Sequence, residues 1–86
     1  MENGYQKNDI ELLIQPLFGE AAKISIDEFD TIGELKKKIA TIANIRREDQ
    51  NLIHFGEVLK DDNKTLLQCK VLDKDTIVVT RKMVFS

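Results

Sequence analysis

The chain has 86 residues, of which 42% are hydrophobic, and this size and composition suit one small domain with a single core. Its 13 basic and 15 acidic side chains give a formal net charge of −2, which argues against a nucleic-acid-binding protein, because such a protein needs a basic surface to neutralise phosphates. Aromatic residues make up 6% of the chain, too few to suggest a stacking surface for bases.

The cysteine content and the absence of long apolar stretches bear on the cellular compartment in which we expect the protein. A single cysteine, Cys69, excludes an internal disulfide framework and favours a reducing environment. No stretch approaches the roughly 20 consecutive apolar residues of a membrane span, and the first nine residues, MENGYQKND, lack the apolar segment of a signal peptide. We therefore expect a cytoplasmic or nuclear protein that does not engage a membrane.

The N-terminal third predicts an arm followed by a β-hairpin. Residues 1–9 show no periodicity and are expected to form a flexible arm. Residues 10–15 (IELLIQ) and residues 23–29 (KISIDEF) are β-type runs, and the intervening PLFGE, with Pro16 and Gly19, is typical of a turn. The proline lies beside the turn, where its missing N–H does little harm to a strand ladder.

An amphipathic helix follows the hairpin. Thr31 and Glu34 have the spacing of a capping box, in which each side chain accepts a backbone N–H of the first turn. Lys36–Lys38 fall mostly outside the apolar stripe and are expected to be solvated, and Asn44 suits the left-handed conformation just past a helix end. The stripe itself recurs at spacings of three, four and three residues: Ile32, Leu35, Ile39 and Ile42.

The C-terminal half predicts short strands separated by turns. In chain order these are a charged turn at 46–50, a strand at 52–55, a reversal at Gly56 into a short strand at 58–59, a loop at 61–64, a helical turn within 66–71, a turn at 73–75 and a strand at 76–82. A hairpin, one helix and further strands indicate an α+β architecture with a mixed sheet wrapped over one helix. The predicted core is Leu12, Ile14, Ile24, Ile26, Ile32, Leu35, Ile39, Leu52, Leu59, Leu66, Val71, Ile77 and Val79.

Four ordered stretches resemble ubiquitin and its single-domain relatives. They are DTIGELKKKIA (30–40), LIHFGEVLKDD (52–62), KTL (64–66) and DTIVV (75–79), and the match runs from 10 to 83 with one extra residue in the 61–64 loop. The resemblance implies the β-grasp fold, a ubiquitin-like domain at 10–83 and a C-terminal tail at 84–86.

The resemblance also implies an apolar recognition patch on the sheet. Its three apolar positions correspond to Leu17, Ile53 and Thr80, with Gly56 beside them. Because Thr80 replaces a valine while Val78 replaces a bordering histidine, we expect the patch to be shifted along the last strand. Burying a few such side chains contributes about 1.5–3 kcal/mol each before the costs of binding, which suits a weak, transient contact.

The residues around this patch differ from those of ubiquitin. Phe18 adds an aromatic side chain if it is exposed, and Lys82 is the main positive charge that remains of ubiquitin's basic rim. Since rim charges set encounter rate and partner choice, a partner set copied from ubiquitin is not expected to apply unchanged.

The tail departs from the pattern of conjugated modifiers. Phe85 and Ser86 stand where the family has the Gly-Gly pair that activating enzymes require, and Glu20, Glu57 and Asp73 replace three lysines used for building chains, whereas Lys36 and Lys38 are kept. The resemblance therefore implies a non-conjugated ubiquitin-like domain.

Two residue types invite chemical interpretations. His54 has no second histidine or nearby cysteine as a metal co-ligand, so we expect a partly exposed strand residue rather than a metal ligand or general base. Cys69 is expected to fill the core rather than to form a thiol–base pair with His54. The basic residues at 36–38 and 46–47 are expected to form a solvated face, because flanking acids dilute their field.

These observations predict a monomeric protein-interaction module that is not an enzyme and uses no cofactor or metal. By resemblance, its partners are proteasome subunits or ubiquitin receptors, bound through the sheet patch, and the domain is part of a larger protein. Two alternatives stay open. One is a covalent modifier whose Gly-Gly lies beyond Ser86, and the other is a structural domain that packs within its own parent protein.

Overall fold

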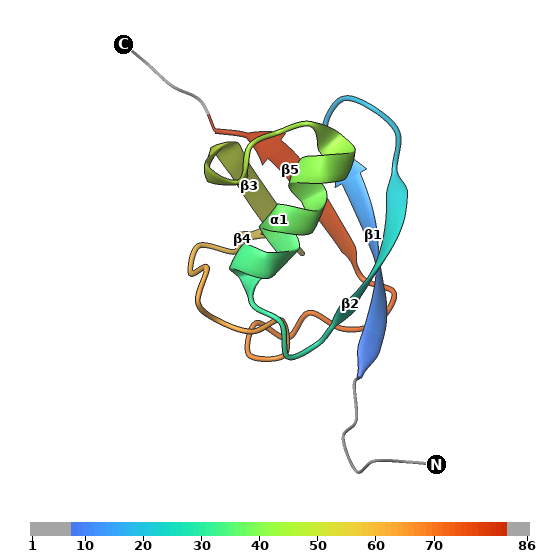
Figure 1. The fold of residues 1–86 in the computed structure, drawn as a ribbon, viewed down its shortest axis with the longest axis vertical. Coiled ribbons are helices and arrows are strands. Elements are labelled where there is room, and N and C mark those ends of the chain that lie inside the picture. The colour runs from blue at the N-terminus through green and yellow to red at the C-terminus, as the bar shows by residue number, and fades with distance from the viewer. Residues whose placement is uncertain (1–7, 83–86) are drawn as a thin grey trace.

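The computed structural model of the protein describes residues 8–82 (Figure 1). Residues 1–7 of the predicted arm and the predicted tail at 84–86 lie outside the described residues. The elements follow the predicted order: β1 (Asp9–Pro16), β2 (Ala22–Asp27), α1 (Ile32–Ala43), the 3₁₀ helix η1 (Arg47–Asp49), β3 (Gln50–His54), β4 (Glu57–Val58) and β5 (Thr76–Arg81). Within the charged segment predicted as a turn, η1 forms. Residues 66–70 form the predicted helical turn, in which the Cys69 N–H donates to the Thr65 carbonyl at 3.1 Å and the Lys70 N–H donates to the Leu67 carbonyl at 3.0 Å.

The five strands form one mixed sheet that is covered on one face by α1 (Figure 1). The strand order is β2-β1-β5-β3-β4. β1 runs antiparallel to β2 and parallel to β5, and β5 runs antiparallel to β3. The predicted α+β architecture, with a sheet wrapped over a single helix, is therefore confirmed.

The core lies between α1 and the concave face of the sheet. All predicted core residues are buried except Ile24, which packs against the core but stays partly exposed. The prediction of a buried Ile24 is wrong: on the edge strand β2 only Ile26 is buried, and Ile24 stays partly exposed. Two further isoleucines, Ile10 and Ile45, complete the core and had not been predicted.

The helix begins and ends where its caps predict. The Thr31 hydroxyl accepts the backbone N–H of Glu34 at 3.2 Å, and Asn44 is left-handed at φ 56°. At 3.6 residues per turn, Ile42 and Lys36 lie on opposite margins of the apolar stripe. Ile42, which was not in the predicted core, is 48% exposed. The prediction of a solvated Lys36 is wrong, because the loop that carries Asp62 covers that margin and buries the side chain.

Candidate functional site

The outer face of the three central strands, opposite α1, carries half-buried, uncharged side chains at its centre, whereas Glu11 of β1 on the same face is charged. Val78 of β5 lies at its centre, since Gln15 of β1 and Ile53 of β3 are paired with it on either side. One step along β5 on the same face, Thr80 is paired with Asn51. Side chains at such paired positions are direct neighbours across a sheet. Val78 and Ile53, two of the predicted patch residues, therefore lie side by side.

Several predicted residues meet at the β3–β4 end of this face. A hollow of about 340 Å³, which we term the sheet-face hollow, is lined by Ile53, Phe55, Gly56, Lys74, Asp75, Thr76 and Val78. Three of these, Ile53, Gly56 and Val78, were predicted, whereas Phe55 was missed although 83% of it is exposed. The signal that could have identified Phe55 is an aromatic residue directly before a turn glycine.

Leu17 and Phe18 lie at a separate place. They line a second, mostly apolar groove of about 300 Å³ between the β1–β2 loop and the end of α1, which we term the loop groove; its other lining residues are Pro16, Ala43, Ile45, Val79, Thr80 and Arg81. Leu17 is 63% exposed and Phe18 is 88% exposed. The predicted patch residues are thus divided between two hollows, and Thr80 belongs with Leu17.

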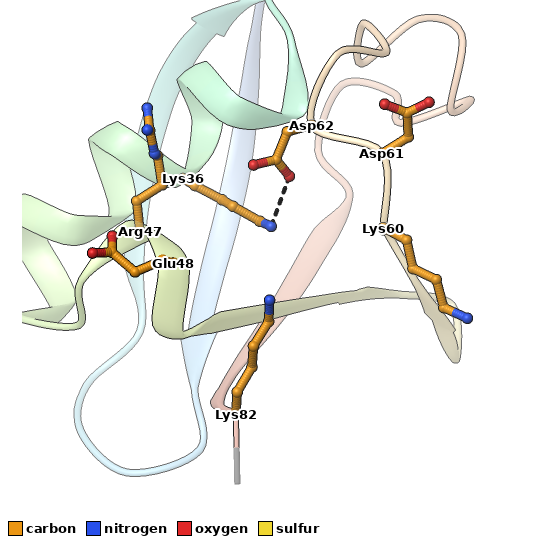
Figure 2. A pocket seen from close by; sticks show the side chains of 7 residues that line it. All are labelled: Lys36, Arg47, Glu48, Lys60, Asp61, Asp62 and Lys82. Atoms are coloured by element: carbon orange, nitrogen blue, oxygen red, sulfur yellow. Dashed lines mark hydrogen bonds and ion pairs between the residues drawn. The ribbon is translucent and has the colours of Figure 1, made fainter. Parts of the chain in front are cut away.

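Lys82 lines a third, charged hollow on the helix side of the sheet. Figure 2 shows its side chain pointing toward the Lys36–Asp62 ion pair, in which Nζ and Oδ1 are 2.8 Å apart. Arg47 and Lys60 point away from this pair (Figure 2). Basic and acidic side chains both line this hollow: Lys36, Arg47, Glu48, Lys60, Asp61, Asp62 and Lys82. Lys82 therefore shares no hollow with Ile53 or Val78.

His54 is a buried structural residue, so the prediction of partial exposure is wrong. The residue is 7% exposed, and its ring Nε2 lies 2.8 Å from Asp75 Oδ2. Since an ionised carboxylate can only accept, the ring nitrogen donates this bond. The same Oδ2 accepts the backbone N–H of Leu72 at 2.9 Å. The pair joins the end of β3 to the turn before β5, and Asp75 also lines the sheet-face hollow.

The Asp75 carboxylate makes the stability of the fold depend on pH. Burial raises its pKa, whereas the hydrogen bonds from His54 and from the Leu72 backbone lower it, and the net shift is below the ordinary value of 3.8. A carboxyl group whose pKa is lowered in the folded state stabilises the fold at pH values above its ordinary pKa. This stabilisation is lost as the pH falls through the folded-state pKa. In urea titrations, we expect the stability deficit of Asp75→Asn to be largest above about pH 5 and to shrink below about pH 4. The exposed Glu20→Gln serves as control, and a deficit that is constant with pH would contradict the assignment.

The other residues considered as reactive or charged site residues, Cys69 and the basic side chains, make structural contacts instead. Burial raises the pKa of the Cys69 thiol, which disfavours the thiolate that a nucleophile needs. Lys37 and Arg46 form ion pairs with neighbouring acids, Glu34 and Asp49. Within residues 8–82, no group of three or more His, Cys, Asp or Glu side chains is placed to hold a metal ion. In the same part of the chain, no helix is long and apolar enough to cross a membrane.

The fold and the outer-face surface define a class of protein. A five-stranded mixed sheet of order β2-β1-β5-β3-β4 over one helix is the β-grasp fold, and with the apolar residues on its outer face it is that of a ubiquitin-like domain. The chain belongs to the ubiquitin family, because the model of that family matches residues 12–84. It is 38% identical over 61 residues to the ubiquitin-like protein NEDD8-like protein 2 of Dictyostelium discoideum, covering 71% of this chain and 75% of that protein.

Further relatives include part of a larger protein and solved structures. Over 63 residues, 73% of this chain, it is 38% identical to the 2'-5'-oligoadenylate synthase-like protein 2 of Mus musculus, of which the match spans 12%. The UBL domain of Plasmodium falciparum Dsk2 has a TM-score of 0.81 at 28% identity, covering 87% of this chain and all of that one. The ubiquitin of Caldiarchaeum subterraneum has a TM-score of 0.79 at 21% identity, covering 92% of this chain and all of that one, which shows the fold alone.

Proposed function

We propose that the chain is a non-conjugated ubiquitin-like interaction module that binds partner proteins through the outer face of its sheet. The observation that carries the proposal is the side-by-side placement of Ile53 and Val78, which are partly exposed and whose strand partners carry no charge. Apolar residues grouped on an exposed face mark interaction sites more often than scattered ones do. Proteasome subunits and ubiquitin receptors are the proposed partner classes, and we expect the module to act as a monomer without enzymatic activity.

Two relatives support the view that the module is part of a larger protein. The Dsk2 structure is named as a UBL domain, and the match to the mouse synthase-like protein spans 12% of that protein. The residues at the Gly-Gly positions, Phe85 and Ser86, support a non-covalent role, since a bulky side chain does not suit a site that accepts a slim tail. Of the two lysines kept at chain-building positions, Lys36 is buried and Lys38 is exposed.

A double substitution tests the interaction surface. We expect Leu17→Ala combined with Ile53→Ala to weaken binding by at least about tenfold, because Ile53→Ala removes apolar area from the outer face and Leu17→Ala removes it from the loop groove, which Thr80 of the outer face also lines. The probes are isolated ubiquitin-binding domains from ubiquitin receptors and proteasome subunits, titrated into the labelled domain by NMR. The unperturbed amide spectrum of the variant establishes that the fold is intact. Equal affinity of variant and wild type would remove the surface from consideration.

The alternative of covalent conjugation is tested with an activating enzyme. The full encoded protein, including any residues beyond Ser86, is incubated with ATP and a ubiquitin-type activating enzyme, with ubiquitin as the positive control. We expect no thioester adduct of this chain. An adduct would favour the covalent modifier, whereas chemical-shift changes produced only by fragments of the parent protein would favour a structural role.

A further inference from the structure

Phe55 occupies a backbone position that ordinarily excludes its side chain. It forms with Gly56 the two-residue turn of the β3–β4 hairpin, in which His54 is paired with Glu57. Both turn residues have positive φ, 49° and 80°, as in a type I′ turn, where Asn, Asp and Gly are preferred. A bulky residue is strained in this region. Folding alone therefore favours a smaller residue at this position and does not account for a phenylalanine.

The ring of Phe55 is held at the rim of the sheet-face hollow. It meets the ring of His54 in a T-shaped arrangement, with centroids 4.6 Å apart and planes at 72°. The imidazole is itself fixed by its hydrogen bond to Asp75. The exposed ring thus lies against an immobilised side chain, and a phenylalanine has only two side-chain torsions to be restricted when a partner covers it. A pre-organised aromatic side chain of this kind loses little entropy on binding.

The charged groups that line the hollow are bonded to other groups of the domain. Lys74 donates a hydrogen bond to the carboxylate of Glu11, which raises the pKa of Lys74 and lowers that of Glu11, so both stay charged and neutralise each other at neutral pH. Asp75 is bonded to His54. The other lining residues carry no charge: Ile53, Phe55, Gly56, Thr76 and Val78. The hollow therefore offers an acidic ligand no free cation, and its one carboxylate, Asp75, already accepts hydrogen bonds from within the domain.

We propose that Phe55 is the aromatic anchor of the sheet-face hollow, and that the ring and the hollow bind an apolar, uncharged face of a protein partner. An aliphatic side chain of that partner lies between Phe55 and Val78, in a hollow of about 340 Å³. The inference rests on the proposed function. It adds that the β3–β4 end of the outer face supplies most of the binding affinity, and that the partner surface is apolar and uncharged. A partner with acidic side chains gains no binding affinity from them at this hollow, because the hollow has no free basic group to pair with them.

The second exposed phenylalanine provides a matched control. Phe55→Ala and Phe18→Ala each remove one exposed ring, the first from the sheet-face hollow and the second from the loop groove. Against the partner domain that binds the wild type most tightly by NMR titration, we expect Phe55→Ala to weaken binding by at least about tenfold and Phe18→Ala by less than about twofold. Wild-type affinity should change by less than about threefold between about 50 and 300 mM salt.

A glycine substitution separates binding from folding. Phe55→Gly relieves the positive φ, so its melting temperature is expected to equal or exceed that of the wild type while its affinity falls as in Phe55→Ala. A clear drop in melting temperature would overturn the inference, because the ring would then serve the fold. Near-wild-type binding by Phe55→Ala, equal losses in the two alanine variants, or a steep salt dependence would overturn it as well.

The outcomes distinguish this inference from the proposed function. If Leu17→Ala with Ile53→Ala abolishes binding while Phe55→Ala preserves it, the proposed interaction surface is supported and the role of Phe55 as anchor is ruled out. If none of the ubiquitin-binding domains binds the wild-type chain, the proposed function fails and the anchor fails with it. Loss of binding in Phe55→Ala and in the double variant, with Phe18→Ala unaffected, supports both.

Discussion

Leu35→Ala is expected to lower the free energy of unfolding by about 2–5 kcal/mol, through lost burial and the cavity left behind. Leu35 is fully buried in the core on α1. Because the stability of a domain of this size is about 5–15 kcal/mol, the loss is a large fraction of the total. Urea unfolding followed by circular dichroism measures it, as a lower midpoint with an unchanged slope. Should the variant be too unstable to titrate, Ile39→Val at another fully buried position is expected to cost about 0.5–1.5 kcal/mol.

Ile42→Ala is the control on the same helix. The periodicity of the sequence places Ile42 in the apolar stripe with Leu35, yet the residue is 48% exposed in the folded domain. Its truncation is therefore expected to cost less than about 1 kcal/mol, since much of the removed surface was already in water. Similar losses for the two variants would mean that the C-terminal turn of α1 packs more closely than the structure describes.

The fold was predictable from the sequence because its local signals agree with one another. Thr31 and Asn44 mark the ends of α1, and the alternation in β1 and β5 places every second residue in the core. The margins of elements were less predictable, because burial there depends on segments distant in the chain. Lys36 is covered by the loop at Asp62, 26 residues away, and no helical periodicity carries that information.

The candidate site was predictable in part for a similar reason. Alternation in β3 and β5 places Ile53 and Val78 on the outer face, but their direct adjacency follows from the register between the strands. Resemblance grouped Leu17 with Ile53, whereas the β1–β2 loop places Leu17 in the loop groove with Ala43 and Ile45. His54 and Asp75 are 21 residues apart, so their hydrogen bond had no local signal. The exposure of Phe55 follows from a turn conformation that residue preferences disfavour.

The ion pair between Lys36 and Asp62 is expected to respond unequally to removal of its two partners. The Lys36 side chain is 7% exposed, whereas that of Asp62 is 45% exposed. Asp62→Asn leaves a nearly buried ammonium without its counter-charge, and we expect a loss of about 1–3 kcal/mol in the free energy of unfolding. Lys36→Met leaves a carboxylate that water can solvate and keeps an apolar stem in the core margin, so its stability should lie within about 1 kcal/mol of the wild type.

The double variant separates the charge pair from the packing of the lysine stem. If the cost of Asp62→Asn arises from the stranded ammonium, Lys36→Met must suppress it, and the double variant should be about as stable as Lys36→Met alone. A coupling energy of this kind is expected for residues in direct contact, whereas distant sites behave additively. Additive losses in urea titrations would instead assign the effect of Asp62→Asn to the loop itself, whose backbone carbonyl at Asp62 accepts the N–H of Gly33 at 3.0 Å.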